Sequence, residues 1–327
     1  MITPRPYQVE ATQASLKSLN AHGKSLVVMA TGLGKTTVFG EVARYFSKVL
    51  IMAHRKELIE QAEKRMKEQL QKAVGVEMAS LKSNGEDITV ASVQTLAARD
   101  FVWQPDLIVV DEAHHAVSPT YQKVLSKYPN AKVLGVTATA DRTDGIALGS
   151  YFKHVAYRYE TKDAIRDKWL VPVVPVRVYG IENLKQAVDA RKTIIFTPNV
   201  ARAIEVAGLI GGHFVHGEMA KKQRERVINA FKAGEFQFMV NCNVLTEGFD
   251  CPDIECVAML RATESRSLFT QCLGRGLRLA DDKRDCLYID LTLKMPDHSL
   301  VGPRDALGGV YKELDMLSKA LSWWSTL

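Results

Sequence analysis

The sequence lacks a long apolar run, and this absence excludes a class of protein. No stretch reaches the roughly 18 consecutive apolar residues that a membrane-spanning helix requires. The opening residues 1–6 include no apolar segment of the kind found in secretion signals. We therefore expect a cytoplasmic protein with no membrane partner.

Cysteines are few, and their spacing does not match a zinc site. No two of them are separated by the two residues that are usual between metal ligands. An odd number in a chain expected in a reducing compartment predicts free thiols. The five are Cys242, Cys251, Cys256, Cys272 and Cys286.

No block of like charge stands out, although the net charge is +6. A positive balance is compatible with a polyanionic partner, but charge spread along the chain does not establish one. The 327 residues, of which 46% are hydrophobic and 24% charged, predict a soluble protein of two ordinary domains.

The most informative stretch is residues 25–37, SLVVMATGLGKTT. Its apolar part predicts a buried strand, and a helix is expected to begin near Lys35. The glycines allow backbone N–H groups to approach an anion, and the helix N-terminus adds partial positive charge. This order of parts is typical of a P-loop that binds ATP, in which Lys35 contacts the β- and γ-phosphates and Thr36 binds magnesium. The predicted nucleotide-binding residues of the loop are Thr31, Gly32, Leu33, Gly34, Lys35, Thr36 and Thr37.

One position of that loop departs from the general pattern. Met29 stands where the pattern has its first glycine. The loop by itself therefore leaves open an ordinary glycine-rich turn between a strand and a helix.

Two adjacent carboxylates, Asp111 and Glu112, follow the apolar run Leu107–Val110. Carboxylates at the end of a buried strand are costly unless a positive charge meets them, and magnesium on a bound nucleotide would do so. We expect Asp111 to hold the metal and Glu112 to orient and deprotonate the attacking water. His114 is expected to link the nucleotide to a second domain. The alternative is a helix N-terminus that simply favours acidic residues.

Further polar residues occur at the predicted ends of strands or before a helix. Gln8 precedes a helical pattern, and its amide is suited to contact a base edge, although it is also consistent with an ordinary exposed glutamine. Four more residues would contact phosphate oxygens or, alternatively, only cap loops. These four are Arg55, Ser92, Gln94 and Thr95.

The alternation of apolar runs and helical patterns predicts an α/β fold with two domains, each a mostly parallel sheet flanked by helices. In the first domain, strands are expected at Val49–Ala53, Ile88–Ser92, Leu107–Val110 and Val133–Val136. In the second, they are expected at Thr193–Phe196, His213–Val215, Phe236–Asn241, Cys256–Leu260 and Leu287–Asp290. Because proline is poorly tolerated in a central strand, Pro172 and Pro175 predict an extended crossover between the domains. The predicted boundaries are 1–160, a crossover at 161–181, a second domain at 182–300 and a helical tail at 301–327.

The second domain contains a pair of arginines, Arg275 and Arg278, three residues apart. On a helix they would share one face, and two guanidinium groups together suit a triphosphate better than one point charge. A surface pair of arginines is also common, so this pattern alone does not decide the role.

Taken in order over about residues 5–278, these stretches resemble the superfamily 2 helicases of the DExH kind. The resemblance rests on RPYQ at 5–8, ATGLGKT at 30–36, AHR at 53–55, TVASVQTL at 89–96, DEAH at 111–114, TAT at 137–139, TEGFD at 246–250 and QCLGRGLR at 271–278. The DEAHH and TATADR stretches look most like the RadD-like and UvsW/XPB-like DNA repair group.

The resemblance implies two tandem RecA-like domains with ATP and magnesium between them. It implies that Arg5 and Gln8 contact adenine, that Gln271 faces the γ-phosphate or its water, and that both arginines act as arginine fingers. The resemblance further assigns Gly248 and Asp250 to the nucleotide, and Thr197 and Thr246 to nucleic acid beside the four residues of the first domain.

The implied function is an ATP-dependent DNA helicase or translocase in repair, recombination or replication. We expect a monomer that binds single-stranded, forked or branched DNA, with single-stranded-DNA-binding or repair proteins as partners. Because no wedge-like domain is evident, translocation or remodelling without strand separation is equally consistent. An RNA helicase and a restriction-complex motor remain alternatives. Glu112, Gln271 and the two arginines argue against a non-catalytic ATP-gated clamp.

Overall fold

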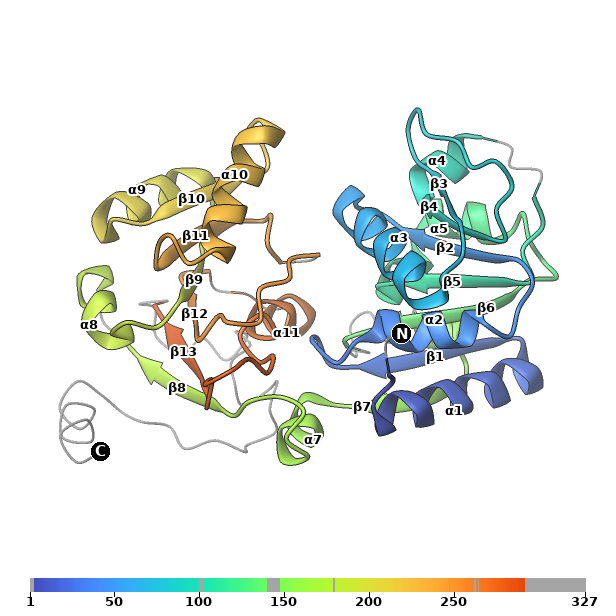
Figure 1. The fold of residues 1–327 in the computed structure, drawn as a ribbon, viewed down its shortest axis with the longest axis horizontal. Helices are drawn as coiled ribbons and strands as arrows, with labels where there is room; N and C mark the ends of the chain where they lie inside the picture. Colours follow the sequence, from blue (N-terminus) through green and yellow to red (C-terminus); the bar gives the residue numbers. More distant parts are fainter. Residues whose placement is uncertain are drawn as a thin grey trace. The chain divides into compact units, whose positions relative to one another are not determined.

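The computed structural model describes residues 3–99, 103–139, 148–178, 180–246, 248–261, 263 and 265–291. It contains two compact units, Met1–Glu160 and Thr161–Leu327 (Figure 1). The helical tail predicted for 301–327 lies outside the described residues. Among the described residues, no helix combines the length and apolar character needed to cross a membrane.

The first unit is built on a parallel sheet, in which the described residues form seven strands ordered β3-β4-β2-β5-β6-β1-β7. The strands are β1 (Lys24–Met29), β2 (Val49–Ala53), β3 (Val74–Glu77), β4 (Ile88–Ser92), β5 (Leu107–Asp111), β6 (Lys132–Thr137) and β7 (Val155–Tyr159). The helices are α1 (Pro6–His22), α2 (Lys35–Ala43), α3 (Lys56–Leu70), α4 (Val93–Ala98), the 3-10 helix η1 (Ala113–Val117) and α5 (Pro119–Leu125).

The central strands of this sheet are buried along their whole length. All residues of β2 and β4 are buried, as are the first four of β5. Continuous apolar strands of this kind are expected where helices cover both faces of a parallel sheet. One core cluster joins Leu26, Leu50 and Ile108 of three strands to Tyr121 and Val124 of α5. The sheet is therefore a rigid frame for the residues at its carboxyl-terminal edge.

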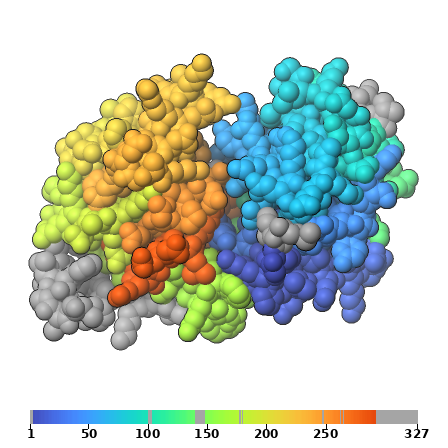
Figure 2. All heavy atoms as spheres, viewed as in Figure 1, coloured from blue at the N-terminus to red at the C-terminus, as the bar shows by residue number. Residues whose placement is uncertain are grey.

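The second unit has its own parallel sheet, ordered β10-β11-β9-β12-β13-β8 within the described residues. The strands are β8 (Val173–Arg177), β9 (Thr193–Phe196), β10 (His213–His216), β11 (Phe238–Cys242), β12 (Cys256–Met259) and β13 (Cys286–Asp290). The helices are α7 (Thr161–Arg166), η2 (Ile181–Asn183), α8 (Leu184–Val188), α9 (Val200–Ile210), α10 (Lys221–Lys232) and α11 (Arg266–Leu273). Helices α9 and α10 form much of this unit's surface in the view of Figure 2. The predicted α/β fold with two parallel-sheet domains is confirmed.

The segment that we expected to be an extended crossover is more ordered than predicted. Its residues form helix α7 and strand β8, and β8 is the edge strand of the second sheet. Pro175 is tolerated there because an edge strand pairs on one side only, in this case with β13.

The prediction of free thiols is confirmed. All five cysteines are free and buried, each packed within the second unit.

Candidate functional site

The predicted P-loop connects β1 to α2 at the carboxyl-terminal edge of the first sheet. Gly32 and Gly34 have φ angles of 90° and 75°, which glycine adopts without the cost that a side chain would impose. Helix α2 begins at Lys35, and Thr37 and Val38 donate their N–H groups to the Gly34 carbonyl at 2.9 and 3.3 Å, so the N–H groups of Lys35 and Thr36 are those that precede any carbonyl of the helix. The loop thus combines backbone donors with the positive end of a helix, as an anion site requires.

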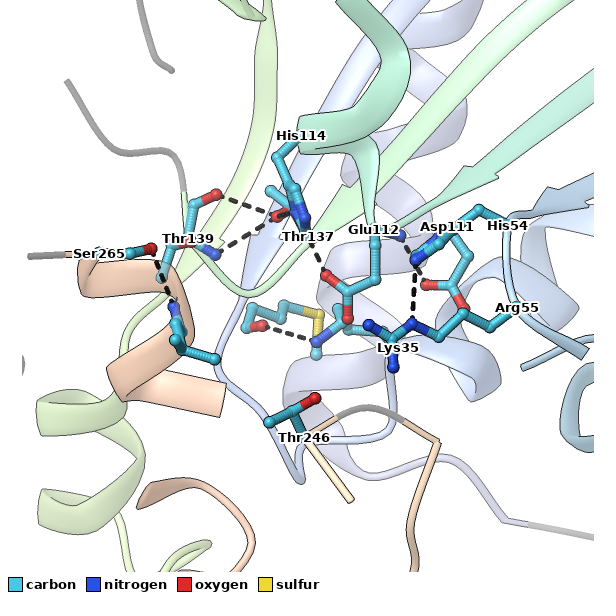
Figure 3. Close-up of polar contacts among 12 residues, drawn as sticks. Lys35, His54, Arg55, Asp111, Glu112, His114, Thr137, Thr139, Thr246 and Ser265 are labelled. Carbon is cyan, nitrogen blue, oxygen red and sulfur yellow. Dashed lines mark hydrogen bonds and ion pairs between the residues drawn. The ribbon is translucent and has the colours of Figure 1, made fainter. Parts of the chain in front are cut away.

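The side chains of the loop divide into inward and outward groups. Thr31, Leu33 and Thr37 are buried, so any contact of Leu33 with a nucleotide would come from its backbone. Lys35 Nζ donates to the Met29 carbonyl oxygen at 3.4 Å, which places the ammonium group over the loop (Figure 3). The carbonyl of Met29 therefore contributes to the site, although the residue departs from the general sequence pattern.

Gln8 anchors the loop from the N-terminal helix. Its Nε2 donates to the Leu33 carbonyl at 2.9 Å, and its Oε1 accepts the backbone N–H of Arg5 at 2.9 Å. The hydroxyl of Tyr7 donates to the same Leu33 carbonyl at 3.1 Å. Gln8 is only 6% exposed, so the alternative of an ordinary exposed glutamine is wrong.

The paired acids lie at the end of β5, two strands away from β1 in the same sheet. Asp111 Oδ1 accepts the backbone N–H of Glu112 at 3.0 Å. Glu112 has a left-handed backbone, with φ 50° and ψ 61°, which costs of order 1–3 kcal/mol for a residue with a side chain. Strain of this kind is concentrated where a side chain must be aimed, and here the residue is the predicted base.

One oxygen of Glu112 is buried without a hydrogen-bond partner. Its Oε2 lies 3.6 Å from His114 Nδ1, which is beyond hydrogen-bonding distance. A buried carboxylate oxygen in this condition is satisfied by a cation or an ordered water. The oxygen groups of Asp111 and Thr36 are of the kind that a hydrated magnesium ion prefers, and an ordered water would satisfy the Glu112 oxygen.

His114 connects the acids to the end of the neighbouring strand β6. Its Nδ1 lies 3.5 Å from Thr137 Oγ1. Thr137 Oγ1 donates to the Thr139 carbonyl at 3.0 Å and accepts the Thr139 N–H at 3.4 Å (Figure 3). These contacts all lie within the first unit, and the expected link of His114 to a second domain stays a prediction.

The residues predicted to contact nucleic acid in the first unit gather around His54. Arg55 Nε donates to His54 Nε2 at 3.3 Å, and Gln94 Nε2 donates to the His54 carbonyl at 3.2 Å. Ser92 Oγ donates to Gln94 Oε1 at 2.7 Å. Thr95 points elsewhere, because its hydroxyl accepts the Ala79 N–H at 3.1 Å. The structure therefore brings three of the four predicted residues together.

In the second unit, Asn241 contacts the predicted nucleic-acid residue Thr197 and the turn that precedes Thr246. The backbone N–H and the hydroxyl of Thr197 donate to the Asn241 carbonyl at 3.0 and 3.2 Å. Asn241 Oδ1 accepts the N–H groups of Val244 and Leu245, at 2.9 and 2.8 Å, just before Thr246. Sequence reasoning did not single out Asn241, although a polar residue closing the apolar run of β11 was a visible signal.

The two arginines do not share a helical face, which corrects the prediction. Helix α11 ends at Leu273, before both of them. The chain beyond the helix presses against β12 and β13, since a Cβ on Gly276 would collide with Cys286 and Val257. Close packing on the sheet therefore replaces a further turn of helix.

Arg275 and Arg278 also differ in their surroundings. Arg275 is 6% exposed and donates through Nη1 to the Phe249 carbonyl at 2.6 Å and through Nη2 to the Thr246 carbonyl at 2.5 Å. Arg278 Nη1 donates to Phe249 at 3.4 Å and pairs with Asp250. Burial lowers the pKa of the Arg278 guanidinium, although Asp250 opposes this shift. The alternative of a solvated surface pair is wrong for Arg275.

The remaining predicted residues of this unit lie on the helix that precedes the arginines and on the loop that the arginines contact. Gln271 is 4% exposed on α11, and Gly248 has a φ of 68° in the loop that precedes Asp250. Loop 246–250 is therefore held by Arg275 on the side of Thr246 and Phe249 and by Arg278 on the side of Asp250.

Comparison with known families agrees with this division of the chain. The family "Type III restriction enzyme, res subunit" matches residues 1–142, and the family "Helicase conserved C-terminal domain" matches residues 179–280. The chain is therefore similar to the superfamily 2 helicases over both of its units. These two families cover the P-loop and acidic residues in the first unit, and the arginine loop in the second.

Relatives in this superfamily include irc3 of Schizosaccharomyces pombe, named as a candidate mitochondrial ATP-dependent helicase. It is 33% identical over 88% of this chain and 57% of its own length. IRC3 of Saccharomyces cerevisiae is 30% identical over 88% of this chain and 51% of its own length. The chain thus spans about half the length of these relatives.

Solved structures of other proteins show the same fold. A fragment of a candidate HsdR subunit of a type I restriction enzyme from Vibrio vulnificus YJ016 has a TM-score of 0.78 at 22% identity, covering 96% of this chain and 68% of that one. S. cerevisiae Dbp5, bound to RNA and ADP BeF3, has a TM-score of 0.73 at 15% identity, covering 95% and 90%. The predicted RecA-like character of both domains is confirmed, whereas the RadD-like and UvsW/XPB-like subgroup stays a prediction.

Proposed function

We propose that this chain is a nucleic-acid-dependent ATPase that moves along or remodels DNA. The observation that supports it best is the buried Glu112 oxygen without a hydrogen-bond partner, on the same sheet edge as the helix N-terminus at Lys35. An oxygen held in this way is suited to accept a proton from a water beside a bound phosphate.

We propose specific contacts for the nucleotide. The backbone of Gly32 to Thr36 would surround the phosphates, and Lys35 would turn from the Met29 carbonyl to the β- and γ-phosphates. Thr36 and Asp111 would hold magnesium, which supplies positive charge to the phosphate oxygens. The nearby Arg5 and Gln8 would contact adenine.

We propose a hydrolysis step in which these groups act together. Glu112 takes the proton of a water, whose oxygen attacks the γ-phosphorus, while the bond to the β-phosphate oxygen breaks and ADP and phosphate leave. Gln271 would orient the same water, and Arg278 would meet charge on the transferring group. Gly248 and Asp250 would approach the nucleotide on the loop that Arg275 and Arg278 hold.

The polymer is proposed to contact the residues around His54 and Asn241, chiefly through phosphate oxygens. Such contacts make affinity fall linearly with salt on a logarithmic scale and depend little on sequence. DNA is favoured over RNA because a relative from Sulfurisphaera tokodaii, 24% identical over 89% of this chain and 81% of its own length, is named a DNA 3′-5′ translocase. A role in repair, a cytoplasmic location and a monomeric state remain predictions.

A restriction-complex motor is the second candidate. The family matched by residues 1–142 is named for a restriction enzyme subunit, which favours it over the RNA helicase alternative. A motor of that kind is expected to translocate on duplex DNA, whereas a repair helicase would prefer single-stranded or forked substrates.

The deciding experiment is the ATPase rate with no polymer and with single-stranded, duplex or forked DNA or RNA. We expect stimulation at least tenfold by one form of DNA, lost as salt rises from about 50 to 200 mM. Stimulation by RNA alone would mean that the polymer on which the ATPase acts is RNA and not DNA. An ATPase unaffected by every polymer, or no hydrolysis at all, would overturn the proposal.

A further inference from the structure

Three histidine rings lie in contact inside the first unit. The ring of His115 meets that of His54 edge-on, with centroids 4.2 Å apart and planes at 61°. It also lies 4.1 Å from the ring of His114 and stacks at 6.3 Å on the buried ring of Tyr121. The hydrolysis step derived above uses neither His115 nor His54.

The two ends of this cluster touch different parts of the proposed machinery. At one end, His114 Nδ1 lies 3.6 Å from Glu112 Oε2. At the other end, His54 receives hydrogen bonds from Arg55 Nε and Gln94 Nε2, at 3.3 and 3.2 Å (Figure 3 shows His54 beside Arg55). The cluster therefore connects the predicted base with two predicted polymer contacts.

The sheet explains why the two ends lie so close. Strands β2 and β5 are neighbours, with Met52 opposite Val110. His54 follows β2, and His115 lies on η1 just after β5. Because parallel strands end at the same edge, the residues that follow them meet there.

A metal site does not account for the cluster. Among the described residues, no group of three or more His, Cys, Asp or Glu side chains has the arrangement to hold a metal ion. Simple space filling does not account for the cluster either. The Arg55 side chain can only donate hydrogen bonds, so its contact with His54 requires that Nε2 of His54 acts as an acceptor. A hydrocarbon ring of similar size would fill the space but offer no acceptor.

We propose that His115 is a positioning residue that couples the nucleotide site to the polymer site through His54. Packed rings cannot shift separately without opening a void, so a movement of η1 carries His54 with it. His54 in turn sets the orientation of Arg55 and Gln94. The inference rests on the proposed function and adds the path by which hydrolysis and polymer binding affect each other within one unit.

The test compares three variants of the full chain. His115→Ala removes the ring, His115→Phe keeps a ring of similar shape, and His54→Phe keeps the packing but loses the acceptor for Arg55. For each, the ATPase rate is measured without polymer and across a titration with the DNA that stimulates the wild type most.

His115→Ala is expected to keep its rate without polymer within about twofold, while the DNA concentration for half-maximal stimulation rises about tenfold, the scale of a lost ring contact. His115→Phe should behave nearly as the wild type. His54→Phe should raise the half-stimulating concentration despite its intact packing. Combining His115→Ala with Arg55→Ala should be no worse than Arg55→Ala alone, because both act on one contact.

Several results would overturn the inference. An unchanged half-stimulating concentration in His115→Ala would do so, and so would an equal fall of the rates with and without DNA, which indicates a purely structural role. If His115→Ala does not fold, as judged by its circular dichroism, a normal titration for His54→Phe would overturn it. Absence of stimulation in the wild type would overturn the proposed function as well, whereas normal wild-type stimulation with unaffected variants overturns this inference alone.

Discussion

The side-chain amide of Gln8 donates a hydrogen bond of 2.9 Å to the carbonyl oxygen of Leu33, at the centre of the P-loop. The oxygen of the same amide accepts the backbone N–H of Arg5 at 2.9 Å. The first turn of α1 therefore fixes the backbone of the loop between β1 and α2. An amide is needed here, since it must donate to one group and accept from another.

Gln8→Ala should weaken ATP binding about tenfold or more, because the Leu33 carbonyl loses one of its two side-chain donors and the loop backbone is released. Gln8→Glu should weaken it as well, since a carboxylate cannot donate to that carbonyl. The measurement is a titration with a fluorescent ATP analogue. The matched control is Gln13→Ala, an exposed glutamine on the same helix, which should bind as the wild type does. Equal affinities for Gln8→Ala and Gln13→Ala would contradict this role.

Gly34→Ala should destabilise the chain by about 1–2 kcal/mol, through its left-handed backbone alone. A Cβ there would also lie 2.6 Å from Gln8 Nε2 and displace that side chain. The control is Gly208→Ala, in the exposed part of α9, where nothing lies within 4 Å and alanine should stabilise the helix by about 0.5–1 kcal/mol. Urea unfolding of both variants is the measurement, and shifts of the same sign would count against the argument.

Most strands that the sequence predicts lie in the interior of each sheet, although the predicted strand His213–Val215 corresponds to the edge strand β10. Val49–Ala53, Ile88–Ser92 and Thr193–Phe196 are confirmed residue for residue, because strands buried on both faces are continuous apolar runs. The three strands not predicted, β3, β7 and β8, all lie at sheet edges. In β7 only Tyr159 is fully buried, so its pattern shows no apolar run.

The parts of the candidate site that the sequence predicted are those in which neighbouring residues of a given type form a short, recognisable pattern. The P-loop and the pair Asp111–Glu112 lie at the sheet edge where the pattern indicated. The contacts of Gln8 with Leu33, and of Arg275 with Thr246, join residues 25 and 29 positions apart. Contacts between residues so far apart leave no periodic pattern in the sequence, so neither the anchoring of the loop nor the burial of Arg275 was predicted.

Glu112→Gln should retain ATP binding and lose hydrolysis by about 100-fold or more, the scale of a removed general base. Glutamine has nearly the same shape, so the left-handed backbone and the contact region of His114 should persist. The rate is measured at saturating ATP and magnesium, and binding is measured separately. Lys35→Ala is the contrasting variant, in which binding should also weaken. A Glu112→Gln rate near that of the wild type would remove Glu112 from the proposed role.

The buried thiols should be nearly unreactive in the folded chain. Burial raises the pKa of Cys251, Cys272 and Cys286 to about 12, which leaves roughly a thousandfold less thiolate at neutral pH than an ordinary cysteine has. A thiol reagent should therefore label five cysteines only after unfolding by guanidinium. Because unfolded thiols ionise first, stability should fall as pH rises above about 9, the ordinary thiol range. Rapid labelling of the native chain would contradict this burial.

Arg278→Ala and Arg275→Ala should both lower turnover at saturating ATP and DNA, for different reasons. Arg278 pairs with the exposed Asp250 and donates to the Phe249 carbonyl at 3.4 Å, and its loss should cost about 10³-fold in rate with a smaller change in stability than the loss of Arg275. Arg275 donates to two buried carbonyls, and its loss should also destabilise the second unit by about 1–3 kcal/mol. Arg275→Lys should not restore that stability, because lysine lacks the planar fork that reaches both oxygens.

Turnover and thermal unfolding of the three variants separate these roles. Normal turnover in both alanine variants would mean that neither arginine acts on the nucleotide, and an unchanged unfolding temperature in Arg275→Ala would mean that it does not hold loop 246–250.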